Sequence, residues 1–448
     1  MRYIPPLLLA LLIAPGLALS QQEAEAATTG AFSGQWRTFY MATVNKGELK
    51  DYHALATGGH LKYTFRFNPS WEMGAALYNS TNLGLQDLTV PDAQTGRFSR
   101  YEEGLFDRLN PAKDVVVLLG ELYLSYTRSG HAFRLGRLKI NTPQINPEDG
   151  RMIPTLVQGF WYAYQGKEGQ GIQAGLLNAM APRSTGSFRG VGESIGDYPA
   201  GRDPEGNASL YPGNTRSDYV VVVNGTLNLA PSLRVNVWDY YAENVSNTLY
   251  VKPQLELGPK WGLEMEWLHQ DRAGDGGNAL DSLRYFDQKG ADVLGVLLRY
   301  GTRKSGISLA YDRIFPRGRF LFPREWGREY FFSFQKLERS EGTADNHALV
   351  VSYQTPVGLG EKVQMQSILS LGRHWKPPAQ DPVRNKYAFP DYTHLNLDLF
   401  FQFEKLPNFR PEVLLTYKAA HGAIPDNPNF YFNKVDMFHL SLILNYNF

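Results

Sequence analysis

The chain ends with the stretch FHLSLILNYNF, from Phe438 to Phe448. Counting back from Phe448, every second side chain is aromatic or leucine, and the side chains between them are mostly polar. A period of two residues indicates a β-strand with one apolar and one polar face. In a soluble sandwich the apolar face would pack on a second sheet, whereas in a membrane barrel it would face lipid. The rest of the chain has to decide between these two folds.

The composition favours a single large barrel. The chain has 448 residues, no cysteine and a formal net charge of +1. This length suits two or three soluble domains or one barrel, and no low-complexity linker divides the sequence. The near-zero net charge gives no support for a nucleic-acid partner. The mean hydropathy of −0.34 excludes a bundle of transmembrane helices, but barrel strands hide their apolar residues in alternation.

The N-terminal residues 1–26 are typical of a secretory signal peptide. Arg2 supplies the positive start, and Leu7 to Leu19 form an apolar core that is too short to span a bilayer comfortably. Cleavage is expected near residue 20 or 26, and the rival interpretation is an N-terminal membrane anchor. No later run has about 18 apolar residues, so we expect no transmembrane helix. The sequence therefore predicts an exported chain with one mature domain, residues 27–448.

The two-residue alternation recurs along the whole mature chain. Residues 61–67 alternate apolar and polar, Asn68 to Ser70 form a tight turn, and residues 71–77 alternate again. Short turns and long polar loops then alternate along the chain, as expected when one rim of a barrel carries tight turns and the other carries external loops. A β-propeller is the main soluble rival, but it would show a repeat of about 40 residues. The sequence contains no such repeat, so an up-and-down antiparallel membrane barrel is favoured.

Parity sharpens the strand count. Nineteen segments look strand-like, including residues 328–337, but bacterial single-chain barrels normally have an even number of strands. Counting up from Phe32 makes Ile307–Ile314 an ascending strand, and counting down from Phe448 makes His347–Tyr353 a descending one. Both hold only if residues 316–346 form one external excursion. We therefore expect eighteen strands.

Charges of both signs lie on the inward faces of the predicted strands. Such a set indicates a wet lumen, because burying unpaired charges is prohibitive. Most of these side chains are expected to pair across the wall, and some are expected to line a permeation path. The basic members are Arg37, Lys62, Arg66, Arg234, Lys252 and Arg299.

The segment from Gly136 to Trp161 is unlike the other strand connections. The alternation changes phase at Gly136, which predicts a β-bulge there. Three prolines and an Asp-Gly pair then prevent regular strand pairing. The segment also carries apolar side chains, so it is expected to fold inward and pack on the lumen wall as a constriction loop. The candidate constriction residues are Arg151, Asp149, Lys139, Arg137 and Asn146.

This segment resembles the constriction loop of the OprD family of outer-membrane porins. The family pattern is a strand-ending glycine, a proline-containing loop, Asp or Asn before an Arg, and then proline, glycine and aromatics. Arg151, Pro154 and Gly159 fall on that pattern, and the turn 355–360 is similar to a turn between late strands of the family. The resemblance implies an eighteen-stranded monomeric channel for amino acids, peptides or small carboxylates. The mixed signs of the lumen charges depart from the family's basic lumen wall.

The favoured function is thus a passive, substrate-selective porin in the outer membrane of a Gram-negative bacterium. Its expected partners are the lipid bilayer, small polar or anionic solutes, and the assembly machinery that recognises the C-terminal strand. The alternative is an outer-membrane barrel enzyme such as a phospholipase or esterase, in which His394 or His439 would assist a hydrolytic serine on the barrel wall. The nine histidines show no HExxH motif or paired ligand spacing, so we expect no metal or other cofactor and no catalytic residues.

Overall fold

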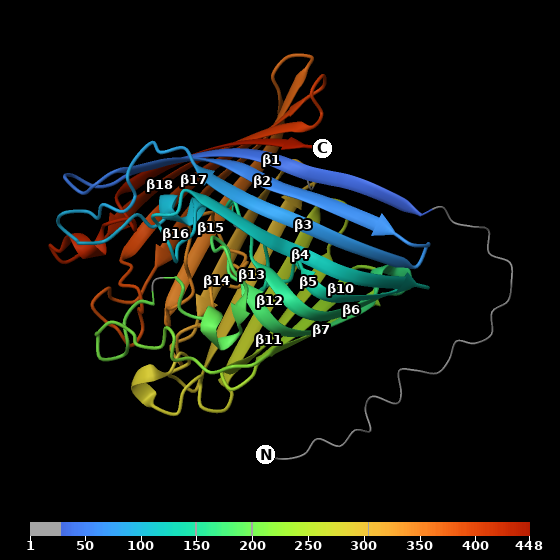
Figure 1. Cartoon of the computed structure of the whole chain (residues 1–448). Helices are drawn as coiled ribbons and strands as arrows, with labels where there is room; N and C mark the ends of the chain where they lie inside the picture. The colour runs from blue at the N-terminus through green and yellow to red at the C-terminus, as the bar shows by residue number, and fades with distance from the viewer. Residues whose placement is uncertain (1–27, 148–149, 199, 303) are drawn as a thin grey trace, which may run out of the picture.

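The computed structural model describes residues 28–147, 150–198, 200–302 and 304–448, which form a tilted barrel of long strands (Figure 1). The predicted signal peptide and Asp149 lie outside the described residues. The strands are β1 Thr29–Val44, β2 Tyr52–Arg66, β3 Trp71–Asn82, β4 Val115–Arg128, β5 His131–Leu138, β6 Leu156–Gln165, β7 Gly171–Ala181, β8 Arg189–Gly190, β9 Val220–Ala230, β10 Leu233–Ala242, β11 Ser246–Glu256, β12 Trp261–Arg272, β13 Gly290–Gly301, β14 Gly306–Ile314, β15 Asn346–Gly358, β16 Val363–Trp375, β17 Asp391–Phe403, β18 Phe409–His421 and β19 Met437–Asn447.

The barrel is closed and consists of eighteen antiparallel strands. β8 is a two-residue strand inside the connection between β7 and β9, and it stands outside this count. Closure comes from the pairing of β1 with β19, in register from Gln35 opposite Asn447 to Val44 opposite Phe438. The predicted strand number is therefore confirmed, and residues 328–337 are not a strand.

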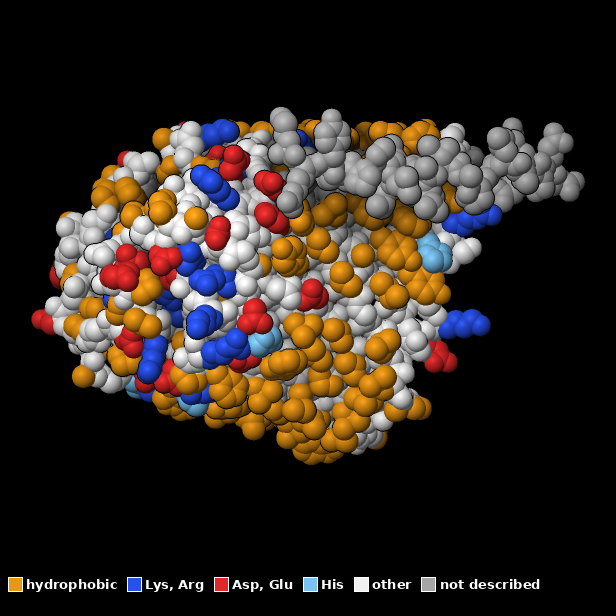
Figure 2. Space-filling view, turned by 90° about the horizontal axis from the view of Figure 1, so that it is seen from below, with side chains coloured by type: hydrophobic (Ala, Val, Ile, Leu, Met, Phe, Trp, Pro, Cys, Tyr) orange, Lys and Arg blue, Asp and Glu red, His pale blue; other side chains and the backbone are white. Residues whose placement is uncertain are grey.

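The outer face of the strands forms an apolar belt around the barrel. On β19, Leu442 is 38% exposed and Tyr446 is 47% exposed, whereas the intervening Ser441 and Asn445 are buried. Figure 2 shows hydrophobic side chains over the middle and right of the molecule and charged side chains gathered at the left, where the long loops lie. Cross-strand aromatic pairs such as Trp71–Tyr126 lie beside the short turns. This distribution is the one expected of a lipid-facing barrel with an interfacial aromatic girdle.

The bulge predicted at Gly136 is wrong. β5 pairs with both β4 and β6 without a register shift, and the shifts lie in the neighbouring ladders, at Ala76/Leu77 and Gln158/Gly159. The alternation only seems to change phase, because the apolar Leu138 lies on the inner, buried face of β5. It is 1% exposed and belongs to a buried cluster that includes loop residues. Gly136 is still required, since it has φ +127° and a Cβ would lie 2.2 Å from the Leu122 carbonyl oxygen.

Two long connections fold into the barrel. The loop 139–155 between β5 and β6, the constriction loop, places Ile145, Met152 and Ile153 in three separate buried clusters, so its inward packing is confirmed. The loop 315–345 between β14 and β15 is the single excursion that the strand count requires. It does not stay external, however, because most of its residues from Arg319 onward are buried. We call it the second inward loop.

The helical elements of the described residues are short 3₁₀ turns within the connections: η2 Glu102–Leu105, η3 Lys167–Gly169, η4 Gly192–Ser194, η5 Asp281–Leu283 and η6 Pro428–Phe430. In the described part of the chain, no helix has the length and apolar character needed to cross a bilayer.

The C-terminal Phe448 completes the closing ladder, which leads to a first prediction. Its backbone N–H donates to the Gly34 carbonyl at 3.1 Å and its carbonyl accepts from the Gly34 N–H at 2.8 Å, while its ring is 54% exposed on the outer face. Deleting Phe448 or changing it to Asp should lower the amount of folded barrel in the membrane, because the seam and a lipid-facing anchor are lost. Heat-modifiable migration on gels measures the folded fraction, and normal levels of the variant would contradict the prediction.

Candidate functional site

The barrel encloses a cavity of about 600 Å³ with a strongly basic lining. Lining residues come from the constriction loop, the second inward loop, the loop 83–114, the connection between β7 and β9, and the inner faces of β1, β2, β3, β18 and β19. Only Glu338 and Glu412 contribute carboxylates among the described lining residues. The basic residues of the lining are Arg37, Arg100, Arg108, Lys139, Arg151, Arg183, Arg324, Arg328, Lys336 and Arg339.

Arg151 lies where the sequence predicted, at the inner surface of the constriction loop and on the cavity wall. Its Nη1 donates to the carbonyl oxygen of Tyr101 at 2.6 Å, and its own carbonyl accepts from Arg37 Nη1 at 2.6 Å. Arg37 also donates through Nε to the Asn445 side chain at 2.8 Å. The loop is thereby tied to β1 and β19, and two guanidinium groups are held in fixed positions beside the cavity.

The other predicted constriction residues divide into one cavity residue and two braces. Lys139 is exposed on the cavity wall, and no ion pair joins it to any described residue. Arg137 does not line the cavity; it donates to the Leu119 carbonyl at 3.0 Å and stacks on Phe188. Asn146 is 2% exposed and also acts as a brace. The role predicted for Asp149 falls outside the described residues.

Asn146 joins the two inward loops. Its Nδ2 donates to the Arg328 carbonyl at 2.9 Å, its Oδ1 accepts from the Arg328 N–H at 3.2 Å, and its own N–H donates to the Trp326 carbonyl at 3.1 Å. Gly327 between these partners has φ +157° and is so close to Asn146 that a Cβ would lie 2.7 Å from its backbone nitrogen. The two loops therefore form one packed unit inside the barrel.

Most of the basic wall residues predicted from strand alternation are neutralised. Lys62 pairs with Glu121 at 2.7 Å, Arg66 with Glu72 at 2.9 Å and Lys252 with Glu264 at 3.1 Å. Arg299 lies 3.3 Å from Glu256 and 3.5 Å from Glu264, and Arg234 donates to Asn228 at 3.1 Å. Pairing across the wall, the simpler of the two predicted roles, is therefore confirmed for these four lysines and arginines with carboxylate partners.

The cavity owes its charge to loop arginines that the sequence reasoning missed. Arg108 and Arg183 lie 4.3 Å and 4.6 Å from the ring centroid of Tyr198, and Arg183 also donates to the Tyr198 hydroxyl at 2.7 Å. Arg339 lies 4.1 Å from the ring of Tyr387. The only sequence signal was the density of arginines in residues 317–339, which the interpretation as an external loop left unused.

These arginines lie close enough to repel one another. Burial lowers the pKa of Arg100 to about 10, and the neighbouring Arg339 and Arg324 act in the same direction. Burial likewise lowers the pKa of Arg324 to about 10, although its ion pair with Glu329 at 3.0 Å opposes that effect. Both groups stay protonated near neutral pH. Glu329 offsets part of the charge of Arg324, as Glu103 does for Arg108 at 2.6 Å and Asp398 for Lys336 at 2.7 Å. The remaining excess of positive charge is what an anion would relieve.

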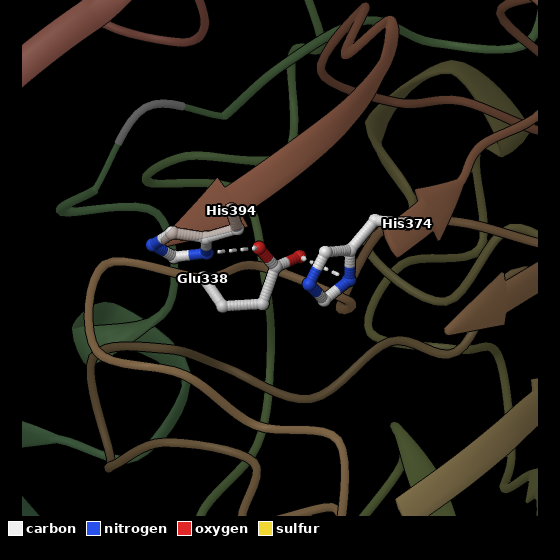
Figure 3. Close-up of side chains that lie close together, drawn as sticks. All are labelled: Glu338, His374 and His394. Atoms are coloured by element: carbon white, nitrogen blue, oxygen red, sulfur yellow. Dashed lines mark ion pairs between the residues drawn. The ribbon is translucent and has the colours of Figure 1, made fainter. Parts of the chain in front are cut away.

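A second cluster lies beside the cavity, where Glu338 meets His374 and His394 (Figure 3). Two imidazoles and a carboxylate are ligands that zinc accepts. However, Lys376 Nζ lies 3.0 Å from Glu338 and Lys418 Nζ lies 3.9 Å from it. A divalent cation would stand beside two ammonium groups that already compensate the carboxylate. The donor set therefore fits loop anchoring better than metal binding.

Comparison with known proteins shows the fold of this chain. No family model matches it, and no curated protein matches it. Solved structures that resemble it include Pseudomonas aeruginosa OccK8 (OprE), with TM-score 0.66, 14% identity, and coverage of 94% of this chain and 98% of the other. P. aeruginosa OpdK with vanillate gives TM-score 0.67, 14% identity and coverage of 94% and 98%. Acinetobacter baumannii OccAB3 gives TM-score 0.71, 12% identity and coverage of 94% and 99%.

These structures are OprD/Occ barrels, so the resemblance that the constriction segment suggested is confirmed at the level of the fold. Gly159, one of the residues that carry it, has φ +156°, and a Cβ there would lie 2.0 Å from the Leu176 carbonyl oxygen. This position therefore requires glycine for a steric reason.

The Asn146 bridge gives a second prediction. Asn146→Ala would leave the backbone N–H and carbonyl of Arg328 without their amide partner, which should lower the free energy of unfolding by about 1–3 kcal/mol. We expect faster proteolysis of the two inward loops and a lower unfolding temperature in detergent. Asn429→Ala is the control, because that exposed amide bonds only locally, to Asn427. Equal protease sensitivity of the two variants would refute the bridging role.

Proposed function

We propose that this chain is a channel of the bacterial outer membrane for passive diffusion of small anionic solutes, carboxylates above all. The observation that carries the proposal is the closed barrel with an apolar belt around a cavity whose described lining residues include ten basic side chains and two carboxylates. The fold shared with OccK8 and OccAB3 supports it. Delivery by the assembly machinery through β19 and action as a monomer remain predictions of the sequence.

The charge of the cavity favours anions over cations. A positive cavity with low-dielectric walls concentrates field lines and raises the local concentration of anions. Guanidinium groups also match the geometry of a carboxylate, because two N–H donors can bind its two oxygens. Aromatic side chains of Phe39, Tyr101, Tyr198, Tyr330 and Phe334 line the same cavity. Aromatic carboxylates are thus good candidate solutes, and vanillate, present in the OpdK structure, belongs to this class.

Release requires that binding weakens along the path. At the end of the barrel with short turns, an opening of about 960 Å³ is lined by Arg234, Arg299, Glu168, Glu256 and Glu264. Two basic and three acidic side chains line it, in contrast to the basic cavity. An anionic solute leaving the cavity would meet a slightly acidic mouth, which suits conduction because a channel must not retain what it admits.

Arg151 provides the test of the proposed function. One arm of its guanidinium is bound to Tyr101, and the group lies on the cavity wall. In Arg151→Ala we expect the anion-over-cation permeability ratio to fall by a factor on the order of three, because one fixed positive charge leaves the narrow path. Reversal potentials across planar bilayers in a salt gradient measure the ratio, and carboxylate uptake into liposomes should slow in parallel.

Arg317→Ala is the matched control for Arg151. Arg317 pairs with Asp271 at 2.9 Å and Asp292 at 3.0 Å on the outside of the barrel, away from the cavity lining. Its loss should leave the permeability ratio unchanged. Unchanged selectivity in Arg151→Ala, or a lower unfolding temperature alone, would make Arg151 a structural strut.

A second candidate function rests on one contact, between His439 Nε2 and Ser441 Oγ at 3.0 Å. Ser441 lines the cavity, so a hydrolytic serine there could meet an ester. The remaining geometry is poorer. His439 Nδ1 contacts the Thr43 hydroxyl at 2.9 Å, the Glu102 carboxylate is 3.9 Å away, and the imidazole is fully buried. The histidine and serine are also adjacent on one face of β19, where a hydrogen bond forms without any catalytic purpose.

The esterase alternative has a direct test. Purified protein and Ser441→Ala should hydrolyse p-nitrophenyl acetate and a short-chain phospholipid no faster than detergent alone. The physical reason is that the imidazole lies in a buried hydrogen-bond network. Turnover by the unaltered protein that disappears in Ser441→Ala would establish the enzyme instead.

A further inference from the structure

Five consecutive residues of the second inward loop, Gln335–Arg339, are held on the inner wall formed by β16, β17 and β18. Gln335 Nε2 donates to Ser370 Oγ at 3.0 Å, and its Oε1 lies 3.0 Å from His374 Nε2. The Lys336 carbonyl accepts from Asn396, and its ammonium pairs with Asp398 at 2.7 Å. This segment, which we call the docked segment, has a wall contact at every residue.

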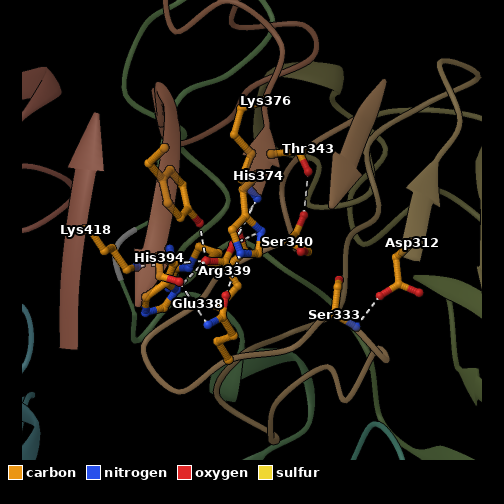
Figure 4. Close-up of polar contacts among 12 residues, drawn as sticks. Asp312, Ser333, Glu338, Arg339, Ser340, Thr343, His374, Lys376, His394 and Lys418 are labelled. Carbon is orange, nitrogen blue, oxygen red and sulfur yellow. Dashed lines mark hydrogen bonds and ion pairs between the residues drawn. The ribbon is translucent and has the colours of Figure 1, made fainter. Parts of the chain in front are cut away.

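The contacts converge on Glu338. Its side chain is 1% exposed and is surrounded by residues of three strands and the following loop (Figures 3 and 4). Lys376 Nζ is 3.0 Å from one carboxylate oxygen, and the Tyr392 hydroxyl donates to the other. His374, His394 and Lys418 lie 3.7 Å, 3.5 Å and 3.9 Å away. The two lysines also bind the backbone on either side, at Leu337 and Arg339.

The charge of Glu338 is stable in this environment. Burial acts to raise its pKa, but the Lys376 ammonium and the hydrogen bond from His394 outweigh burial and hold the pKa well below its usual range. The carboxylate therefore stays ionised in mildly acidic solution. The buried pair of the Glu338 carboxylate and the Lys376 ammonium is costly to break, because removing one member leaves the other charged and unpaired.

The backbone of the docked segment is strained. Leu337, next to Glu338, has φ +68°, a left-handed conformation that a branched non-glycine residue adopts only when its surroundings impose it. Lys418 Nζ donates to its carbonyl at 2.7 Å. The loop is thus held in a conformation that it would be expected to leave once the surrounding contacts were released.

The other side of the docked segment faces the path through the barrel. Phe334 and residues 336–339 all line the basic cavity. We propose that Glu338 is the positioning residue of this channel: its ionic contacts hold the docked segment against the wall, and thereby set the width of the passage. The inference rests on the proposed channel function and goes beyond it by assigning the aperture to one buried carboxylate.

Glu338→Gln tests the inference in single-channel recordings. The amide keeps the shape of the side chain but leaves the buried Lys376 ammonium without its ionic partner, so the docked segment should leave the wall. A segment that leaves the wall moves into the passage and narrows it. Since conduction depends on pore diameter, we expect conductance to fall by about twofold, with frequent transitions between current levels. The size limit for neutral sugars in liposome swelling should shift in the same direction. A residue that only stabilised the fold would not move these readouts.

Glu412→Gln is the matched control. Glu412 also lines the cavity, but it lies on β18 and accepts from Asn445 Nδ2 at 2.9 Å, so its loss removes the same charge without releasing a loop. Equal conductance and equal size limits in the two variants would overturn the inference. Where Glu338→Gln yields no folded barrel, Tyr392→Phe decides, because it removes one hydrogen bond to Glu338 and leaves both lysines paired.

The expected result for Tyr392→Phe is a smaller change in conductance and current noise, in the same direction. If Glu338→Gln does not fold and Tyr392→Phe has the same conductance as the unaltered protein, Glu338 serves folding alone. The unaltered protein also separates the two proposals. If it carries no current, the channel function itself fails, whereas current that is insensitive to Glu338 refutes only the role of this residue.

Discussion

The structure depends on the requirement that backbone N–H and C=O groups at membrane depth find partners within the protein. In hydrocarbon each unpaired group costs several kcal/mol, so a sheet can span the bilayer only when it closes. Here the closure is made by β1 and β19, whose ladder extends to the last residue through the paired backbones of Gly34 and Phe448. Once the eighteen strands are closed, the wall is fixed and its polar face must line an interior.

That interior is filled by loops, and the wall's acidic side chains serve them as acceptors. Glu266 on β12 accepts the N–H of Phe332, and Asp312 on β14 accepts the N–H of Ser333. A folded loop has backbone donors that helices or strands would otherwise satisfy, so buried carboxylates on the wall can take that role. The mixed signs of the wall charges follow from this. Carboxylates bind the loops and the wall lysines, while the loops deliver the arginines to the cavity.

Much of this could be predicted from sequence because it depends on periods and local stiffness. A two-residue period gave the strands, their lipid-facing side and, with parity, their number. Prolines with embedded apolar residues gave the inward packing of the constriction loop. The loop contacts could not be predicted, because they join distant positions without a local pattern: Asn146 and Arg328 are 182 residues apart. Alternation also failed at Leu138, since a loop that covers the inner wall allows an apolar residue there.

The way in which the cations are held explains how a crowded basic cavity can still serve transport. Wall residues such as Lys62 are neutralised by carboxylates, which leaves little of their field for a solute. Arg100 and Arg339 instead rest against aromatic rings, at 4.9 Å from Phe389 and 4.1 Å from Tyr387. A ring fixes the orientation of a guanidinium through its face while the N–H edges are left available. Arg100, oriented in this way, can attract an anion without a competing carboxylate, whereas Glu341 and Glu329 near Arg339 raise the pKa of that group and weaken its field at the cavity.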